Sequence, residues 1–243
     1  MLFAVFYSVK LQKELASSLH FSYIFLSLCD FCIIFAIMKH LFTYIALAFC
    51  SIACHAQQSV EANRHFQAMV KCGGSEIPMT FLRHPKHKRF VIVGKGKYGS
   101  PAIDVATEGR LVVPDSVSDA SGQRYLVRAI GRQAFAHCSR LTEVILPYSV
   151  SEIGDQAFVS CTRLREVTLP KALRVIYPFA FRDCTHLNVV RLNAGNRPAV
   201  YDNIFDQQTL NHATLIIPAG TSTQYSNSLV WGMFHYRVED FDH

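Results

Sequence analysis

The sequence predicts an α/β repeat fold, a solenoid whose coils contribute short strands to one parallel sheet on the concave side. Three observations predict this fold class. Apolar residue types recur every 23 residues in the second half of the chain, each repeat joins a strand-like segment to a turn-like segment, and one repeat is too short to bury a core of its own. Periods between about 20 and 29 residues are typical of solenoids, whose coils are stable only when they stack.

Three consecutive copies establish the period. They read IGRQAFAHCSRLTEVILP at 130–147, IGDQAFVSCTRLREVTLP at 153–170 and IYPFAFRDCTHLNVVRLN at 176–193. Isoleucine, phenylalanine, cysteine, leucine and valine each return at the same place in every copy. We therefore expect equivalent side chains to stack along the axis of the solenoid.

Each copy contains two kinds of segment. In L-x-x-V-x-L the last three side chains alternate inward, outward and inward, as in a short strand. Pro147 and Pro170 follow directly, and since proline has no amide hydrogen to donate to a neighbouring strand, they mark the end of the strand. In I-G-x-x-A-F-x-x-C the apolar residues are spaced by three and four, which predicts a helical or 3₁₀ turn. Tyr177 replaces the glycine in the third copy, so either Gly131 and Gly154 provide close packing or that turn differs locally.

Segments on both sides of the copies predict caps. Residues 111–114 read as a degenerate first strand followed by a hairpin around 119–122, and 215–218 read as a last strand displaced by two residues from the period. Four aromatic or apolar residues remain to cover the open end of the core, namely Tyr225, Trp231, Phe234 and Val238. We assign 109–243 to the solenoid with its C-terminal cap, and 57–108 to an N-terminal region that forms a cap or a small appended unit.

These features resemble a known family. The pattern IGxxAFxxCxxLxxVxLP, the later LIIPAGTSTQY and the single Trp231 ahead of Phe234 look like the BspA-like, 23-residue class of bacterial leucine-rich repeats, over roughly 109–243. The resemblance implies a leucine-rich-repeat solenoid in a surface or secreted protein of anaerobic oral or gut bacteria, some of which are adhesins. It transfers no binding residues. The third copy departs from the pattern at 177–178 and at Asn193, which replaces proline.

An export signal is predicted at 38–56. Met38 and Lys39 open a positive n-region, 41–53 form an apolar h-region, and Ala56 ends a cleavage site. Lipid attachment at Cys54 is the alternative to cleavage after Ala56, and it would be the protein's contact with a membrane. We expect a bacterial protein that is secreted or at the cell surface, on the outer membrane.

Residues 1–37 precede this signal and have two readings. Residues 21–37 are apolar and about long enough for a transmembrane helix, but Asp30 interrupts them. A complete signal that opens on its own methionine favours the other reading, in which 1–37 are a mis-called upstream extension.

Charge argues against a nucleic-acid partner. The first 56 residues hold three of the 24 basic and two of the 18 acidic residues, so 57–243 hold 21 and 16. Eight of those basic residues lie in 57–100, and 101–243 are nearly neutral. A nucleic-acid-binding fold would carry its basic residues along the main body.

Three cysteines, Cys138, Cys161 and Cys184, recur with the repeat. They form either an inter-coil disulfide or a ladder of small buried thiols. We predict buried thiols, because three members cannot pair completely and identical orientation in every coil opposes disulfide geometry. Cys72 has no evident partner.

The segment RHPKHKR at 83–89 is the main charged cluster. His84 and His87 have a spacing seen in some metal sites, but the surrounding basic residues would repel a cation and no carboxylate or thiol completes a ligand set. The cluster could bind a sulfated glycan. We interpret it as a solvated loop before a strand at 90–93.

No motif predicts catalysis. The glycine-rich 94–99 lacks the phosphate-binding pattern G-x-x-x-x-G-K-[ST], and neither G-x-S-x-G nor H-E-x-x-H occurs. We expect no enzyme, no cofactor, no metal and no small-molecule substrate.

The candidate binding residues follow from strand alternation. Side chains next to each inward valine point outward and stack in two columns. They are Glu143, Ile145, Glu166, Thr168, Val189, Arg191, Thr214 and Ile216. We expect an adhesion-type binding protein that engages a protein or glycan partner through these columns, or alternatively a structural component of a surface assembly without a soluble ligand.

The export signal leads to a first prediction. Exported protein should begin at Gln57, because the signal ends on Ala56. Mass spectrometry of the mature N-terminus measures this directly. A retained 2–37 segment would refute it, and a diacylated Cys54 would establish the lipoprotein alternative.

Overall fold

The computed structural model describes residues 43, 64–96, 100–193, 197–201 and 203–240. The predicted signal at 38–56, including Cys54, and the segment 1–37 lie outside these residues, except for Thr43. Residues 60–243 form one compact unit, which is described below. Within the described part, no helix is long and apolar enough to cross a membrane.

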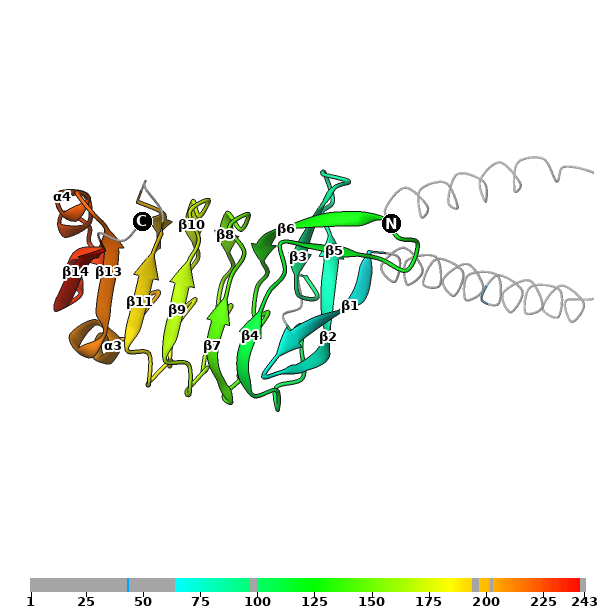
Figure 1. Cartoon of the computed structure of the whole chain (residues 1–243), viewed down its shortest axis with the longest axis horizontal. Helices are drawn as coiled ribbons and strands as arrows, with labels where there is room; N and C mark the ends of the chain where they lie inside the picture. Colours follow the sequence, from blue (N-terminus) through cyan, green and yellow to red (C-terminus); the bar gives the residue numbers. More distant parts are fainter. Residues whose placement is uncertain (1–42, 44–63, 97–99, 194–196, 202, 241–243) are drawn as a thin grey trace, which may run out of the picture. The chain divides into compact units, whose positions relative to one another are not determined.

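The main ladder is a row of parallel strands, one from each coil (Figure 1). In the strands at Glu166–Leu169 and Val189–Leu192 every second residue is buried, which is the alternation expected from L-x-x-V-x-L. The strands, in spatial order, are β4 (Gly109–Val112), β7 (Leu141–Ile145), β9 (Glu166–Leu169), β11 (Val189–Leu192), β13 (Thr214–Pro218) and β14 (Tyr236–Asp240).

A second ladder of parallel strands runs along another side of the coils. It contains β3 (Phe90–Val93), β6 (Arg124–Ile130), β8 (Glu152–Ile153), β10 (Val175–Ile176) and β12 (Ala199–Val200). The expectation of a single parallel sheet was therefore incomplete. The first isoleucine of each repeat, which we assigned to a helical turn, ends a short strand instead.

An antiparallel hairpin joins the two ladders. It consists of β1 (His65–Cys72) and β2 (Ser75–Arg83). β1 pairs with β4 of the main ladder and β2 pairs with β3 of the second ladder, so all these strands belong to one folded sheet. The hairpin thus occupies the place of a preceding coil and pairs with strands that would otherwise be edges.

The segment after each short strand is a series of tight turns and not a helix. Amide-to-carbonyl bonds span three residues, as from Ala134 to Gly131 and from Cys138 to Phe135. Non-glycine residues with positive φ interrupt the turn series with the period of the repeat, at Gln133, Gln156 and Phe179 and again at His137, Ser160 and Asp183. A helix cannot continue through such residues, so the spacing of three and four reflected consecutive turns.

Gly131 and Gly154 provide close packing between coils. Neither has a positive φ. A Cβ at Gly131 would lie 2.7 Å from the Val93 carbonyl oxygen, and one at Gly154 would lie 2.7 Å from the Arg132 nitrogen. Tyr177 keeps the amide-to-carbonyl bond to the preceding coil that both glycines make. Of the two explanations left open by the sequence, close packing is confirmed.

The core is a stack of identical side chains. Phe135, Phe158 and Phe181 stack face to face, with centroids 5.1 Å apart at each step, and Phe205 continues the stack at 5.4 Å. Phe205 then meets Trp231 and Phe234 edge-on, which ends the row.

The C-terminal end is made by short elements, α3 (Gln207–His212), α4 (Ser222–Ser226) and the 3₁₀ turn η1 (Trp231–Met233). Tyr225, Trp231 and Phe234 are fully buried there. Val238 was expected to cover the core as well, but it is 53% exposed. It lies on β14 in register with Ile216, so its side chain is on the face of the main ladder that points away from the core (the outer face).

The repeat cysteines form a buried ladder of free thiols. Cys161 donates its Sγ hydrogen to the Phe135 carbonyl oxygen at 3.1 Å, and Cys184 does the same to Phe158. Burial raises the pKa of Cys138 and Cys184 to about 12. The thiols of Cys161 and Cys184 thus each link one coil to the one before it. Cys72 is also buried and free.

A polar cluster fixes the N-terminal hairpin to the first coil. Asp119 lies in the turn between β5 (Ser116–Ser118) and β6, and its carboxylate accepts from Arg83 of β2 at 2.7 Å and from the Tyr125 hydroxyl at 2.9 Å. Ser121 donates to the other carboxylate oxygen. The Ser121 hydroxyl and then Arg83 hold the pKa of Asp119 well below its usual range. Arg83 therefore anchors the hairpin to the first coil, and the basic cluster predicted at 83–89 is reduced to 84–89.

We expect Phe158→Ala to destabilise the solenoid by about 3–5 kcal/mol, because it removes a fully buried ring stacked on both sides and leaves a cavity. Chemical denaturation followed by circular dichroism measures the change. Tyr148→Ala, at a ring that is 68% exposed, is the matched control and should change stability little. Equal stability of both variants would contradict the stacked core.

Asp119→Asn should reduce stability in a pH-dependent way. The folded carboxyl has a lower pKa than the unfolded one, so its contribution is complete above about pH 4 and is lost as pH falls through the folded pKa. Melting temperatures from pH 7 to pH 2 should show a gap between wild type and variant that narrows with acid. A gap that stays constant would show that the charge of Asp119 is not what stabilises the hairpin.

Candidate functional site

The outer face of the main ladder carries the predicted binding residues. Glu143 pairs in register with Glu166, which pairs with Val189, which pairs with Thr214. The structure therefore brings these four residues into one column. Ile145, Thr168, Arg191 and Ile216 are in register in the same way and form the second column. All eight side chains are half-buried.

The columns are longer than the sequence analysis indicated. β4 adds Arg110 to the first column and Val112 to the second, and β14 adds Tyr236 and Val238. The first strand had been recognised, so alternation around Leu111 would have given the β4 residues. Nothing in the repeat pattern predicts β14, whose residues are YRVED.

Charges on this face are mutually paired. Arg110 Nε lies 3.1 Å from Glu143 Oε2. Arg191 lies 2.5 Å from Asp240 Oδ2 and 3.9 Å from Glu166 Oε1. The Arg110–Glu143 pair is open to solvent and contributes only about 0–1 kcal/mol, but both sets of ion pairs fix the orientation of the long side chains. Between them, Ile145, Thr168 and Val189 form a less polar strip.

Two depressions adjoin the main ladder. One of about 590 Å³ lies at the β1–β2 turn and reaches the first ladder strand, with Lys71, Glu76, Arg110 and Val112 in its lining. The other, of about 420 Å³, lies where β7 and β9 begin and is lined by Thr142, Arg163, Arg165 and His186. His186 Nδ1 lies 2.6 Å from the Thr162 carbonyl oxygen, which requires the proton on Nδ1. This basic group was not predicted from the sequence, because His186 belongs to a different copy from Arg163 and Arg165.

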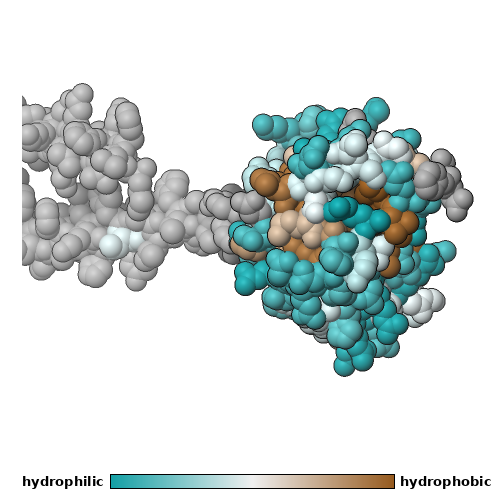
Figure 2. All heavy atoms as spheres, turned by 90° about the vertical axis from the view of Figure 1, so that its left-hand side faces the viewer, coloured by the Kyte–Doolittle hydropathy of each residue, from teal (hydrophilic) through white to brown (hydrophobic). Residues whose placement is uncertain are grey.

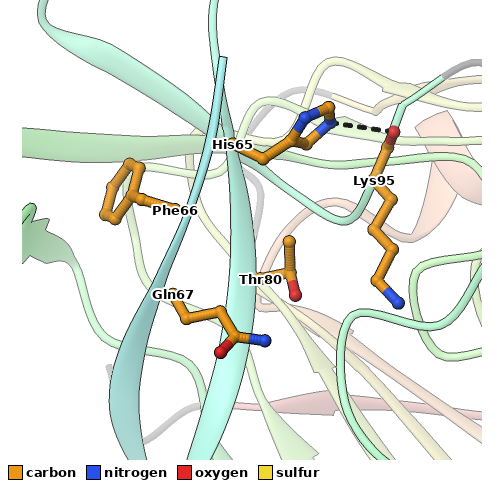
Figure 3. Close-up of a pocket in the computed structure, with 5 residues that line it drawn as sticks. All are labelled: His65, Phe66, Gln67, Thr80 and Lys95. Carbon is orange, nitrogen blue, oxygen red and sulfur yellow. Dashed lines mark hydrogen bonds between the residues drawn. The ribbon is translucent and has the colours of Figure 1, made fainter. Parts of the chain in front are cut away.

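A third depression lies on the N-terminal hairpin (Figure 3). It has a volume of about 350 Å³ and is lined by His65, Phe66, Gln67, Thr80 and Lys95. His65 Nε2 lies 3.0 Å from the Lys95 carbonyl oxygen, and the Gln67 amide and Thr80 side chain approach the same space from β1 and β2 (Figure 3). No acidic residue is among the lining residues, so the depression offers hydrogen bonds and no paired acid and base.

The histidines of the 83–89 loop shape a turn. His84 Nδ1 accepts from the amides of Lys86 and His87 at 3.2 Å each, and the two imidazole rings lie 4.8 Å apart. Burial, and then the charge of His87, lowers the pKa of His84. Among the residues that the structure describes, no group of three His, Cys, Asp or Glu side chains is placed to hold a metal ion.

Comparison with known proteins places the repeats in a family. Residues 124–229 match the BspA type Leucine rich repeat region, in six copies. No curated protein matches this chain in sequence.

Several solved structures are similar to the chain. A leucine-rich repeat protein from Bacteroides capillosus is 25% identical, over 62% of this chain and 99% of its own, with a TM-score of 0.48. A T. pallidum leucine rich repeat protein is 21% identical over 58% and 70%, with a TM-score of 0.42. A leucine rich cell surface protein from Faecalibacterium prausnitzii is 22% identical over 63% and 37%, with a TM-score of 0.41.

Proposed function

Since this chain belongs, through residues 124–229, to the BspA type of bacterial leucine-rich-repeat proteins, we propose that it is an exported binding protein. It engages a protein or glycan partner through the outer face of the main ladder. The observation that carries this proposal is the pair of columns, in which half-buried and exposed side chains of mixed chemistry stand in register on six neighbouring strands.

The face has the composition of a binding surface. Aliphatic and hydroxyl side chains lie between ion-paired arginines and carboxylates, so a partner can bury apolar area while the charges select its orientation. The backbone beneath is a hydrogen-bonded ladder, which holds the side chains in place before the partner arrives and reduces the entropy lost on binding. The adjoining depressions with Arg110 and with Arg163 and Arg165 would accept acidic groups of the same partner.

Two further arguments support the proposal. The sequence at 38–56 has the three regions of a secretory signal, which agrees with a role outside the cytoplasm. Among the residues that the structure describes, the strongly shifted titratable groups are buried thiols of the core and Asp119, which is held by structural partners. Such groups stabilise the fold, so their pKa shifts are accounted for by structural contacts and leave the binding role as the function that the outer face supports.

The test needs a partner, obtained by pull-down from outer-membrane and extracellular fractions. Thr168→Trp should then weaken binding at least tenfold, about 1.4 kcal/mol, because it places a bulky ring at the centre of the second column without breaking an ion pair. Surface plasmon resonance of wild type and variant gives the ratio of dissociation constants.

Glu152→Trp is the matched control, since it puts the same ring on an exposed position of the second ladder. It should bind like wild type. The Thr168→Trp variant could bind the partner normally while the double variant Arg163→Gln with Arg165→Gln loses binding. The binding surface would then be the depression lined by Arg163, Arg165 and His186. A pull-down that recovers only neighbouring copies of the chain would instead support a structural role.

A further inference from the structure

The last strand of the main ladder, β14, has an open edge. It is the end of the strand order, and within the described residues it pairs only with β13. Every other main-ladder strand has a neighbour on both sides, including β4, which β1 covers. An uncovered strand edge is a template for pairing with another chain.

The end of the solenoid around β14 is apolar. Figure 2 looks onto this end and shows hydrophobic residues gathered near its centre, with hydrophilic residues around them. Four large apolar side chains are at least half exposed here, namely Leu229 at 85%, Tyr236 and Val238 at 53% each, and Met233 at 50%. Exposed apolar groups clustered in this way mark interaction sites.

The hydrogen-bond pattern shows which groups of β14 face outward. Ala219 donates its amide to the Asp240 carbonyl oxygen, so Asp240 directs its backbone groups toward β13. Backbone groups alternate along a strand. Tyr236 and Val238 therefore also bond to β13, and the amides and carbonyls of Arg237 and Glu239 point to the open edge.

Charge selects one register for a second copy. In an antiparallel pair, the residues whose backbone groups point to the open edge of one strand must lie opposite the corresponding residues of the other strand. Centring the pair on Val238 places Arg237 opposite Glu239 twice, whereas centring it on Arg237 or on Glu239 places like charges opposite. Opposite charges across a pair stabilise it and like charges destabilise it.

We propose that β14 pairs antiparallel with β14 of a second copy of this chain, about a two-fold axis at Val238. The pair makes four backbone hydrogen bonds, two between each Arg237 and the Glu239 that faces it. The two main ladders become one continuous sheet, and both binding faces lie on it. The inference is independent of the partner proposed above.

The interface is small, so the affinity is moderate. One five-residue strand on each side, with Leu229 and Met233 beside it, buries less than the roughly 1,200 Å² of a standard stable interface. We expect a dissociation constant on the order of micromolar to tens of micromolar. The protein purified after expression of the full chain should therefore dimerise in sedimentation velocity runs at about 100 µM.

Charge reversal tests the register. Arg237→Glu places Glu opposite Glu239, and Glu239→Arg places Arg opposite Arg237, so each variant alone should dimerise at least tenfold more weakly. A mixture of the two restores opposite charges at both pairs and should form a heterodimer. Arg174→Glu and Glu108→Arg reverse exposed charges elsewhere and should leave dimerisation unchanged, alone and mixed.

A cross-link provides a second measurement that does not depend on these two side chains, which also bind within the chain. Arg237 donates to the Gly232 carbonyl, and Glu239 accepts from the Ser222 amide. Val238→Cys should form a disulfide-linked dimer on mild oxidation, because directly opposed residues of a non-hydrogen-bonded pair lie about 4.5 Å apart at Cα. Thr168→Cys, in the same column but inside the sheet, should not.

Each result decides the proposal. The proposal is supported if the wild type dimerises at about 100 µM, each single charge reversal weakens the dimer, and the mixture of the two variants forms a heterodimer. Cross-linking of Val238→Cys but not of Thr168→Cys supports it as well. A monomer at that concentration, a mixture of folded variants that stays monomeric, or equal cross-linking of Val238→Cys and Thr168→Cys would overturn it.

Discussion

Backbone hydrogen bonding between successive coils is the constraint on which the rest of this structure depends. Each coil donates amides to the carbonyls of its neighbour in the main ladder, in the second ladder and in the turns, as from Phe135 to Ala157 and from Phe158 to Ala180. This bonding fixes equivalent residues one strand spacing apart, about 4.8 Å. Any side chain at a repeated position must therefore pack against a copy of itself.

The composition of the repeat follows from that constraint. Phenylalanine rings at this spacing stack face to face, and a thiol can reach the carbonyl of the preceding coil. Glycine provides the close approach of the coils at Gly131 and Gly154, because a Cβ at Gly154 would lie within 3.0 Å of backbone atoms of the coil before it. The repeat period is thus maintained by contacts between copies, since one coil encloses no core alone.

The same constraint makes both ends of the stack special. At the N-terminal end, the β1–β2 hairpin pairs with the first strand of each ladder, and Arg83 fixes it to the Asp119 turn. At the C-terminal end, Trp231 and Phe234 turn edge-on to Phe205 and close the core. The core is closed there, but the backbone edge of β14 is not. The outer face, in contrast, bears no packing requirement, so it is free to carry the mixed side chains of a binding surface.

The sequence by itself determined the repeat, the inward and outward residues of its strands, and the register of the columns from Glu143 to Ile216. It did so because strand alternation and a constant period are local properties that one chain displays directly. The buried state of Cys138, Cys161 and Cys184 followed from the same period.

Only the tertiary structure decided what depends on neighbours distant in sequence. The spacing of three and four suggested a helical or 3₁₀ turn. Bonds that span three residues are present, but positive φ at residues such as Gln133 makes them separate turns that bond to the next coil. The hairpin at 65–83 gave no signal of its role, because its partners β3 and β4 follow it at separations that no local pattern encodes. The same holds for Val238, whose apolar side chain suggested burial. Its strand is the last of the ladder, so no further coil covers it.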